Sequence, residues 1–251
     1  MSRRQTIPGS DEAPKLNPQQ VGAFFDTRAT RIPELGPLHA VIYQEKQGQL
    51  ATLRDAAEVD CILPLLALDG QQHLLDVGCG TGRWASRVAP RVASYVGIDF
   101  SEGLLSYAQQ DLSTYPQCSF KRLAADAISP AAFGAIRFDR FLCAGISIYL
   151  NDDQLLRMLS GIVSVSAAQC RLVIREPVGL GKRLTLTNHW SDELEDEYHA
   201  IYRTEGEIRA AMEETLVGEG FTWIGSGDVY VDPSLNNRAD TRQRWILLER
   251  R

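Results

Sequence analysis

The stretch that most constrains the fold is residues 74–85, LLDVGCGTGRWA. An apolar run ends in Asp76 and breaks into three closely spaced glycines, Gly78, Gly80 and Gly82. Glycines permit positive φ and let a ligand approach the backbone, and a helix that follows offers free N–H groups at its N-terminus. The stretch therefore predicts a strand, a tight turn and a helix, with a nucleotide-like ligand at the turn.

Downstream of this stretch, short apolar runs alternate with helical patterns. The expected strands are HLLDV, SYVGID, SFKRLAAD, RFDRFLCAG and RLVIRE, and the expected helices are 83–92, 101–112 and 152–165. Such alternation predicts an α/β fold, a doubly wound and mostly parallel sheet with helices on both faces. After a helix at 205–216, FTWIGSGDVYVD and RQRWILLER predict an antiparallel C-terminal edge.

The remaining segments predict the domain organisation. Residues 1–17 are polar and resemble a flexible tail, and residues 18–70 have helical periodicity and predict an N-terminal helical cap. Residues 71–251 form the α/β domain, with an irregular insertion at about 177–204. Within the insertion, the acidic run 192–197 predicts the start of a solvated helix.

Composition narrows the functional classes. The chain has 251 residues and a formal charge of −6, which argues against a nucleic-acid partner because such proteins usually carry a basic face. Five scattered cysteines lack CxxC or zinc spacing, so no metal is expected. Neither a signal peptide nor a membrane span is predicted, and we expect a cytoplasmic protein. The oligomeric state is left open.

A carboxylate and the glycine spacing indicate the kind of ligand. Asp99 closes the second expected strand in GIDFS, where an acid can accept hydrogen bonds from both ribose hydroxyls. The alternative, a plain helix N-terminal acid, is weaker because Ser101 can cap that helix. A dinucleotide loop reads GxGxxG, but here Arg83 stands in place of the third glycine and Trp84 follows. This favours a ligand without a diphosphate and disfavours a nicotinamide-dependent oxidoreductase, which is kept as an alternative.

Taken together, LDVGCGTGRWA, VGIDFS and AADA resemble the class I (Rossmann-like) S-adenosylmethionine-dependent methyltransferases of small-molecule type, over roughly residues 72–176. The resemblance implies that S-adenosyl-L-methionine is the cofactor. It implies sites for the methionine portion (Asp76, Gly78, Cys79, Gly80, Gly82), the ribose (Asp99), the adenine (Phe100, Asp126, Ala127), the methyl-donor side (Cys143, Ala144, Gly145, Ile146) and a covering helix (Phe25, Arg28).

One departure from the family narrows the acceptor. Members that methylate DNA bases or protein glutamine carry an Asp/Asn-Pro-Pro-Tyr/Phe motif after the fourth strand, whereas this chain has CAGISIYL. We therefore expect in-line methyl transfer to an oxygen or nitrogen of a small-molecule acceptor, a secondary metabolite or a sugar-like compound. Aminopropyl transfer, cyclisation and cofactor binding without turnover are the alternatives on the same fold.

Candidates for the chemistry lie where the regular pattern ends. Glu176, His189 and His199 are the candidate catalytic residues, since transfer to a hydroxyl usually needs a base. The alternatives are an ion pair for Glu176 and structural roles for the histidines. The expected substrate-binding residues are Tyr149, Trp190, Tyr198 and Tyr202, and Tyr43 is a weaker candidate in the cap. The segment LNNRADTRQRW could bind a carboxylate or hydroxyls, or be a polar hairpin loop.

Overall fold

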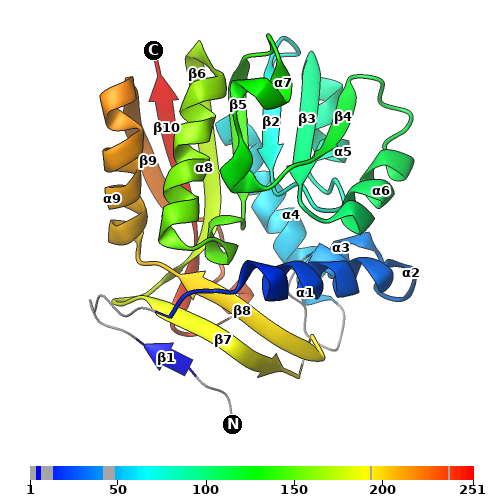
Figure 1. The fold of residues 1–251 in the computed structure, drawn as a ribbon, viewed down its shortest axis with the longest axis vertical. Helices are drawn as coiled ribbons and strands as arrows, with labels where there is room; N and C mark the ends of the chain where they lie inside the picture. Colours follow the sequence, from blue (N-terminus) through cyan, green and yellow to red (C-terminus); the bar gives the residue numbers. More distant parts are fainter. Residues whose placement is uncertain (1–3, 7–13, 42–48, 193, 237) are drawn as a thin grey trace.

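The computed structural model describes residues 4–6, 14–41, 49–192, 194–236 and 238–251 (Figure 1). Its centre is a seven-stranded sheet in which the strand order is β4-β3-β2-β5-β6-β10-β9. The bounds are β4 Cys118–Arg122, β3 Ser94–Asp99, β2 His73–Val77, β5 Phe138–Ala144, β6 Ser166–Gly179, β10 Thr241–Arg250 and β9 Phe221–Asp228. The first five strands in this order are parallel, which confirms the predicted doubly wound α/β fold.

Both faces of the sheet are buried, which explains the nearly continuous apolar runs of its strands. Neighbouring residues of β2 point to opposite faces: Leu75 packs in the cluster that contains α8 and α9, and Leu74 packs in the cluster that contains α4 and α5. Figure 1 shows these two pairs of helices on opposite sides of the sheet.

The helices begin mostly where the sequence predicts. The longer ones are α1 Pro18–Thr30, α4 Leu50–Ile62, α6 Glu102–Asp111, α8 Asp152–Val165 and α9 Glu205–Thr215, and the shorter ones are α2 Ile32–Leu35, α3 Pro37–Val41, α5 Ala85–Val88 and α7 Pro130–Phe133. The Ser101 hydroxyl accepts a hydrogen bond from the Leu104 N–H (3.4 Å), as expected of an N-cap. The helix predicted at 83–92 is wrong in length, because Pro90 cannot donate within an α-helix and the chain continues as a 3₁₀ turn, Ala89–Arg91.

The insertion is more regular than predicted. It is a β-hairpin of β7 (Leu184–Ser191) and β8 (Asp196–Tyr202), so the prediction of a helix at 192–197 is wrong. Tyr198, Ala200 and Tyr202 pack in one cluster and Ile201 packs in another, and this two-residue period fits a strand rather than a helix. Asp192 and Glu195 precede β8, and Asp196 and Glu197 begin it.

Part of the predicted tail is also ordered. Arg4–Thr6 form β1, which pairs antiparallel with β7 and completes a three-stranded second sheet. Leu16 is buried, and its backbone N–H donates to the Asn151 side chain (2.8 Å). Residues 1–3 and 7–13, which make up much of the predicted tail, and Tyr43 lie outside the described residues.

The antiparallel end of the sheet is confirmed with one refinement. β10 pairs antiparallel with both β6 and β9, so β9 forms the edge and β10 lies one position inside it. The start of β10 therefore lies at the same edge of the sheet as the carboxyl ends of the parallel strands. This edge is the lower one in Figure 1, where α1–α3 and the second sheet cover it.

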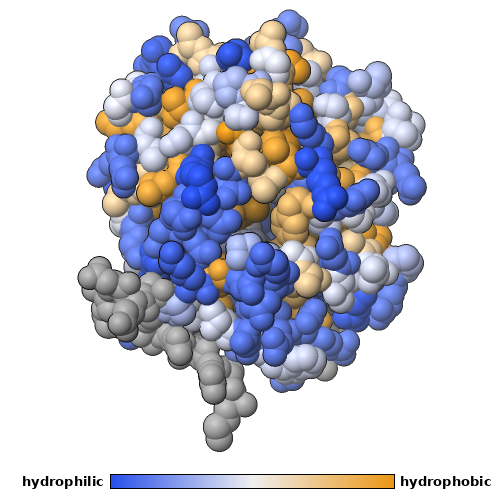
Figure 2. Space-filling model, in the orientation of Figure 1, coloured by the Kyte–Doolittle hydropathy of each residue, from blue (hydrophilic) through white to orange (hydrophobic). Residues whose placement is uncertain are grey.

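On the face shown in Figure 2, charged and polar side chains surround smaller apolar patches. None of the helices in the described ranges combines the length and the apolar character needed to cross a membrane.

Candidate active site

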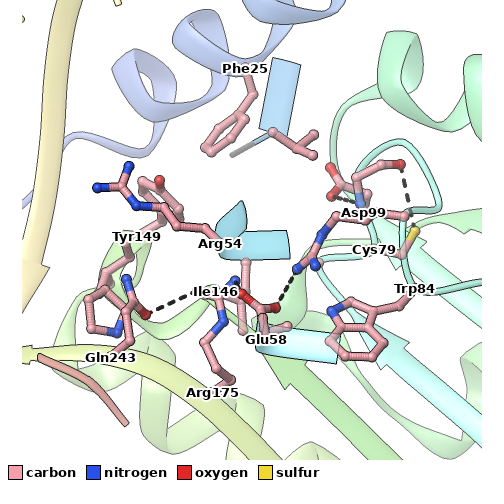
Figure 3. Close-up of a pocket in the computed structure, with 18 of the residues that line it drawn as sticks. Phe25, Arg54, Glu58, Cys79, Trp84, Asp99, Ile146, Tyr149, Arg175 and Gln243 are labelled. Atoms are coloured by element: carbon pink, nitrogen blue, oxygen red, sulfur yellow. Dashed lines mark hydrogen bonds and ion pairs between the residues drawn. The ribbon is translucent and has the colours of Figure 1, made fainter. Parts of the chain in front are cut away.

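A cavity lies at the carboxyl edge of the sheet, beneath α1 and the hairpin β7–β8. It encloses about 1090 Å³ including its opening to solvent. Its wall joins the glycine loop and Asp99 to side chains from α4, β6, β8 and β10 (Figure 3). In a doubly wound sheet this edge is where ligands bind.

The glycine loop fits the role that its sequence predicts. Gly78 has φ +77°, and a Cβ added there would lie 2.9 Å from Ile146 Cδ1 across the loop, so a larger residue would close the approach to the backbone. Gly82 also has φ +77°, but a Cβ added there would lie 2.7 Å from the Leu112 side chain, at the end of α6. Gly78 therefore borders the cavity, whereas Gly82 allows the loop to pack closely against the C-terminal end of α6.

Asp99 is held at the end of β3 by two backbone N–H groups. Its Oδ2 accepts from Gly80 (3.0 Å) and its Oδ1 from Ser101 (2.9 Å). Burial raises the pKa of this carboxyl, and the backbone hydrogen bonds partly oppose that rise. Each oxygen retains a further lone pair, so the group can still accept from two hydroxyls of a ligand.

α1 covers this part of the cavity with an aromatic side chain. The Phe25 ring packs edge-on against Phe100 (centroids 5.9 Å apart) and Tyr149 (4.9 Å). Phe25 thus joins the wall that contains Phe100 to the wall that contains Tyr149.

The cavity brings together more than half of the residues predicted to bind the cofactor. Those that line it are Phe25, Gly78, Cys79, Gly80, Asp99, Phe100, Ala144, Gly145 and Ile146. In the part of the chain that the structure describes, the others lie outside the lining: Arg28, Asp76, Gly82, Asp126, Ala127 and Cys143.

The side chains outside the lining have other partners. The Asp76 carboxyl accepts from the Tyr95 hydroxyl (2.5 Å), and burial raises its pKa to about 7. Asp126 pairs with Arg157 (2.9 Å) on α8. Arg28 was expected to cover the cofactor, but its guanidinium instead donates to backbone carbonyls of α3, including that of Ala40 (3.2 Å). Cys143 is fully buried in the core.

A charged network, which the sequence analysis missed, forms the floor of the cavity. Glu58 of α4 accepts from Arg83 (2.6 Å) and Arg175 (2.6 Å), and Arg83 also pairs with Asp55 (2.8 Å). Arg87 shares the Asp55 carboxylate. Burial opposes the ionisation of Glu58, but the charges of Arg175 and Arg83 outweigh it and lower its pKa.

This network ties the helical cap to the glycine loop. The spacing of Asp55 and Glu58 places both on one face of a helix, which is the only signal that the sequence offers. Their partner Arg83 comes after β2, and Arg175 lies on β6. Local sequence patterns therefore could not predict the pairing.

Three of the four residues expected to bind substrate line the cavity. The Tyr149 hydroxyl lies 3.2 Å from that of Tyr198, and the Tyr202 hydroxyl donates to Tyr198 (3.4 Å). Trp190, the fourth, is 56% exposed and donates to Asp192 (3.0 Å) on the surface. The lining also includes Ile146, expected on the methyl-donor side, and Thr241 and Gln243 from the LNNRADTRQRW segment. Arg54, Trp84 and Tyr230 line it without a predicted binding role.

The three candidate catalytic residues lie outside the cavity lining, as far as the structure describes it. Glu176 is fully buried between Arg175 and Pro177, which line the cavity, since alternate residues of a strand point to opposite faces. The Glu176 carboxylate accepts from the Ser147 N–H (2.7 Å), and burial raises its pKa to about 7. His199 is buried and accepts from the Asn188 N–H (3.2 Å), while His189 is half-buried on β7.

Part of the chain is similar to known methyltransferases. Residues 74–168 match a family described as a methyltransferase domain. Among curated proteins, the chondramide synthase of Chondromyces crocatus is 28% identical over 112 residues, which are 43% of this chain, and this chain covers 3% of that protein's length.

Two solved structures illustrate the shared fold. Magnesium protoporphyrin IX methyltransferase from Synechocystis, with bound S-adenosylmethionine, is 17% identical with a TM-score of 0.64, over 96% of this chain and 100% of that one. The Burkholderia thailandensis 1,6-didemethyltoxoflavin-N1-methyltransferase, with its substrate and S-adenosylhomocysteine bound, is 18% identical with a TM-score of 0.65, over 99% and 96%. The predicted α/β fold is thereby confirmed, residues 74–168 are similar to a methyltransferase domain, and both structural relatives hold S-adenosylmethionine or S-adenosylhomocysteine.

Proposed function

We propose that this protein transfers the methyl group of S-adenosylmethionine to an oxygen or nitrogen of a small-molecule acceptor, a secondary metabolite or a sugar-like compound. The observation that carries the proposal is that one cavity contains both the glycine loop with Asp99 and a second set of side chains suited to an acceptor. The two structural relatives act on small molecules, as their names say, which supports the same class of acceptor here.

The residues of one half of the cavity fit the donor. Asp99 can accept from the ribose hydroxyls, Phe100 can lie against the adenine, and the loop at Gly78 and Gly80 leaves room for the methionine portion. When bound, S-adenosylmethionine supplies a methyl group on a positively charged sulfur. Phe25 and Tyr149 close this half from above and exclude water from the transfer.

The acceptor half offers groups that orient a ligand. Burial raises the pKa values of Tyr149 and Tyr198, so their hydroxyls stay neutral at physiological pH and donate or accept hydrogen bonds rather than remove protons. Catalysis then depends chiefly on holding the nucleophile in line with the methyl carbon. Glu176, His189 and His199 stay predictions as catalytic residues, and their positions outside the lining do not support a direct role.

The first experiment measures cofactor choice. Isothermal titration of the purified chain with S-adenosylhomocysteine and with NADH should show binding of the former and none of the latter. Tight binding of NADH alone would contradict the proposal and favour an oxidoreductase.

A second experiment distinguishes the reaction types. Incubation with S-adenosylmethionine and a panel of metabolites, followed by mass spectrometry, should find an acceptor that gains one methyl group. A product that gains an aminopropyl group, or one rearranged at constant mass, would assign the chain to the alternative reactions. Cofactor binding without a product across acceptors of every class would favour a binding module.

A further inference from the structure

The half of the cavity proposed for the acceptor, which includes Arg175 and Gln243, lies beyond the half proposed for the donor along the sheet. Gly78 follows β2, and β6 and β10 are the second and third strands beyond it in the sheet order. With neighbouring strands about 4.8 Å apart, Arg175 on β6 and Gln243 on β10 lie roughly 10 and 14 Å along the sheet from the glycine loop strand. The donor is expected at the ends of β3, β2 and β5, so this end of the cavity is left to the acceptor.

The charged network reaches from the glycine loop to Arg175 on β6 and carries an excess of positive charge. The guanidinium groups of Arg83, Arg87 and Arg175 share the two carboxylates of Asp55 and Glu58. Three positive charges therefore face two negative ones within this network, in a chain whose formal charge is −6. Arg83 and Arg175 are buried, with side chains 7% and 12% exposed, whereas Arg87 is 32% exposed; water compensates part of the excess, and a bound anion can compensate the rest.

Two N–H donors beside this network have no hydrogen-bond acceptor among the described residues. They are Nε of Arg175, whose side chain is 12% exposed, and Nε1 of Trp84, which is 3% exposed. Figure 3 shows Arg175 and Trp84 on either side of Glu58, with the indole nitrogen directed toward Glu58. Neither donor is hydrogen-bonded to Glu58, whose oxygens accept from arginines, so both can take an acceptor atom from a ligand.

We propose that the acceptor substrate carries an anionic oxygen group, a carboxylate or a phosphate, which binds to Arg175 and Trp84. The inference rests on the proposed methyl transfer and adds the chemical class of its substrate. Thr241 and Gln243, which also line the cavity, supply neutral hydrogen-bonding groups beside the anion. The anion would satisfy the two unpartnered donors and compensate the excess charge, while the tyrosines contact the rest of the molecule.

The test uses simple anions and their neutral analogues. The protein saturated with S-adenosylhomocysteine is titrated calorimetrically with benzoate and methyl benzoate, and with phenyl phosphate and phenol. We expect at least one anion to bind about 10- to 100-fold more tightly than its neutral analogue, as for a charge-assisted hydrogen bond in a buried site. The anion that binds more tightly distinguishes a carboxylate from a phosphate acceptor.

Variants assign this preference to the network. Arg175→Met should abolish the preference for the anion, and Arg175→Lys should keep only part of it because an ammonium lacks the planar fork. Both should bind S-adenosylhomocysteine within about twofold of the wild type, which also reports that they fold. Arg244→Met is the matched control, since Arg244 lies on β10 but pairs with Glu205 and Asp228 outside the cavity lining.

The proposal is overturned if the wild type shows no preference for either anion, or if Arg175→Met retains the preference. Loss of S-adenosylhomocysteine binding in the wild type would instead contradict the proposed function. In that case the same titrations without S-adenosylhomocysteine would still decide whether the anion site exists.

Discussion

Replacement of Glu176 by Gln should change how the stability of this protein depends on pH. Glu176 is fully buried in the folded state. One of its carboxylate oxygens accepts a hydrogen bond from Ser147, and the other has no partner among the described residues. Burial outweighs the nearby charges of Arg175 and Arg203 and raises its pKa from 4.5 to about 7. A glutamine has nearly the same shape and does not titrate.

The sign follows from proton linkage. Between pH 4.5 and 7 the folded protein holds a proton that the unfolded chain has released, so the free energy of unfolding falls as the pH rises. The full effect is about 3 kcal/mol, and about 2.5 kcal/mol of it develops between pH 5 and pH 8. The Glu176→Gln variant lacks this loss. Its free energy of unfolding, relative to that of the wild type, should therefore increase by about 2.5 kcal/mol from pH 5 to pH 8.

Urea denaturation of both proteins at several pH values measures this difference, and groups common to both, such as Asp76, cancel. Glu249→Gln is the control: hydrogen bonding to Arg251 lowers the Glu249 pKa, and the resulting stability is already present at pH 5. A Glu176→Gln difference that stays constant within about 0.5 kcal/mol would refute the reasoning. It would show that Glu176 is ionised in the folded protein and stabilised by its arginine neighbours.

Three further substitutions test the site. Asp99→Asn should weaken S-adenosylhomocysteine binding by about 10- to 100-fold in isothermal titration, since one of two acceptor oxygens is lost, and unchanged affinity would remove Asp99 from the donor site. Gly78→Ala should lower the free energy of unfolding by about 1–3 kcal/mol in urea, because its φ is positive and its Cβ would meet Ile146; stability equal to the wild type would contradict this. His189→Ala should leave turnover within about twofold while Tyr149→Phe lowers it several-fold, and a tenfold loss in His189→Ala would restore that histidine as a catalytic candidate.

The parts of the fold that were predicted correctly are those encoded in short stretches. A strand buried on both faces needs a continuous apolar run, and a loop that approaches a ligand needs glycine, so β2 and the turn after it could be recognised locally. Asp99 was recognisable for the same reason, because it closes the next parallel strand at the same edge of the sheet.

Errors arose where one sequence pattern fits two structures. The acidic run before Tyr198 has the charge of a solvated helix, but the hairpin forms because one face of β7 and β8 packs in a cluster with Phe24 of α1. His189 and Trp190 have suitable chemistry, yet the register of that hairpin places them away from the cavity lining.

The sequence by itself determined the class of fold and predicted the donor and the edge of the sheet for it, because glycine spacing and strand periodicity act over a few residues. Only the tertiary structure decided which side chains line the rest of the cavity. Arg83, which in the sequence only marks the absence of a third glycine, joins Glu58 and Arg175 from distant segments into one buried network. Such pairing depends on the packing of α4 and β6 against the loop, a long-range property that local patterns do not encode.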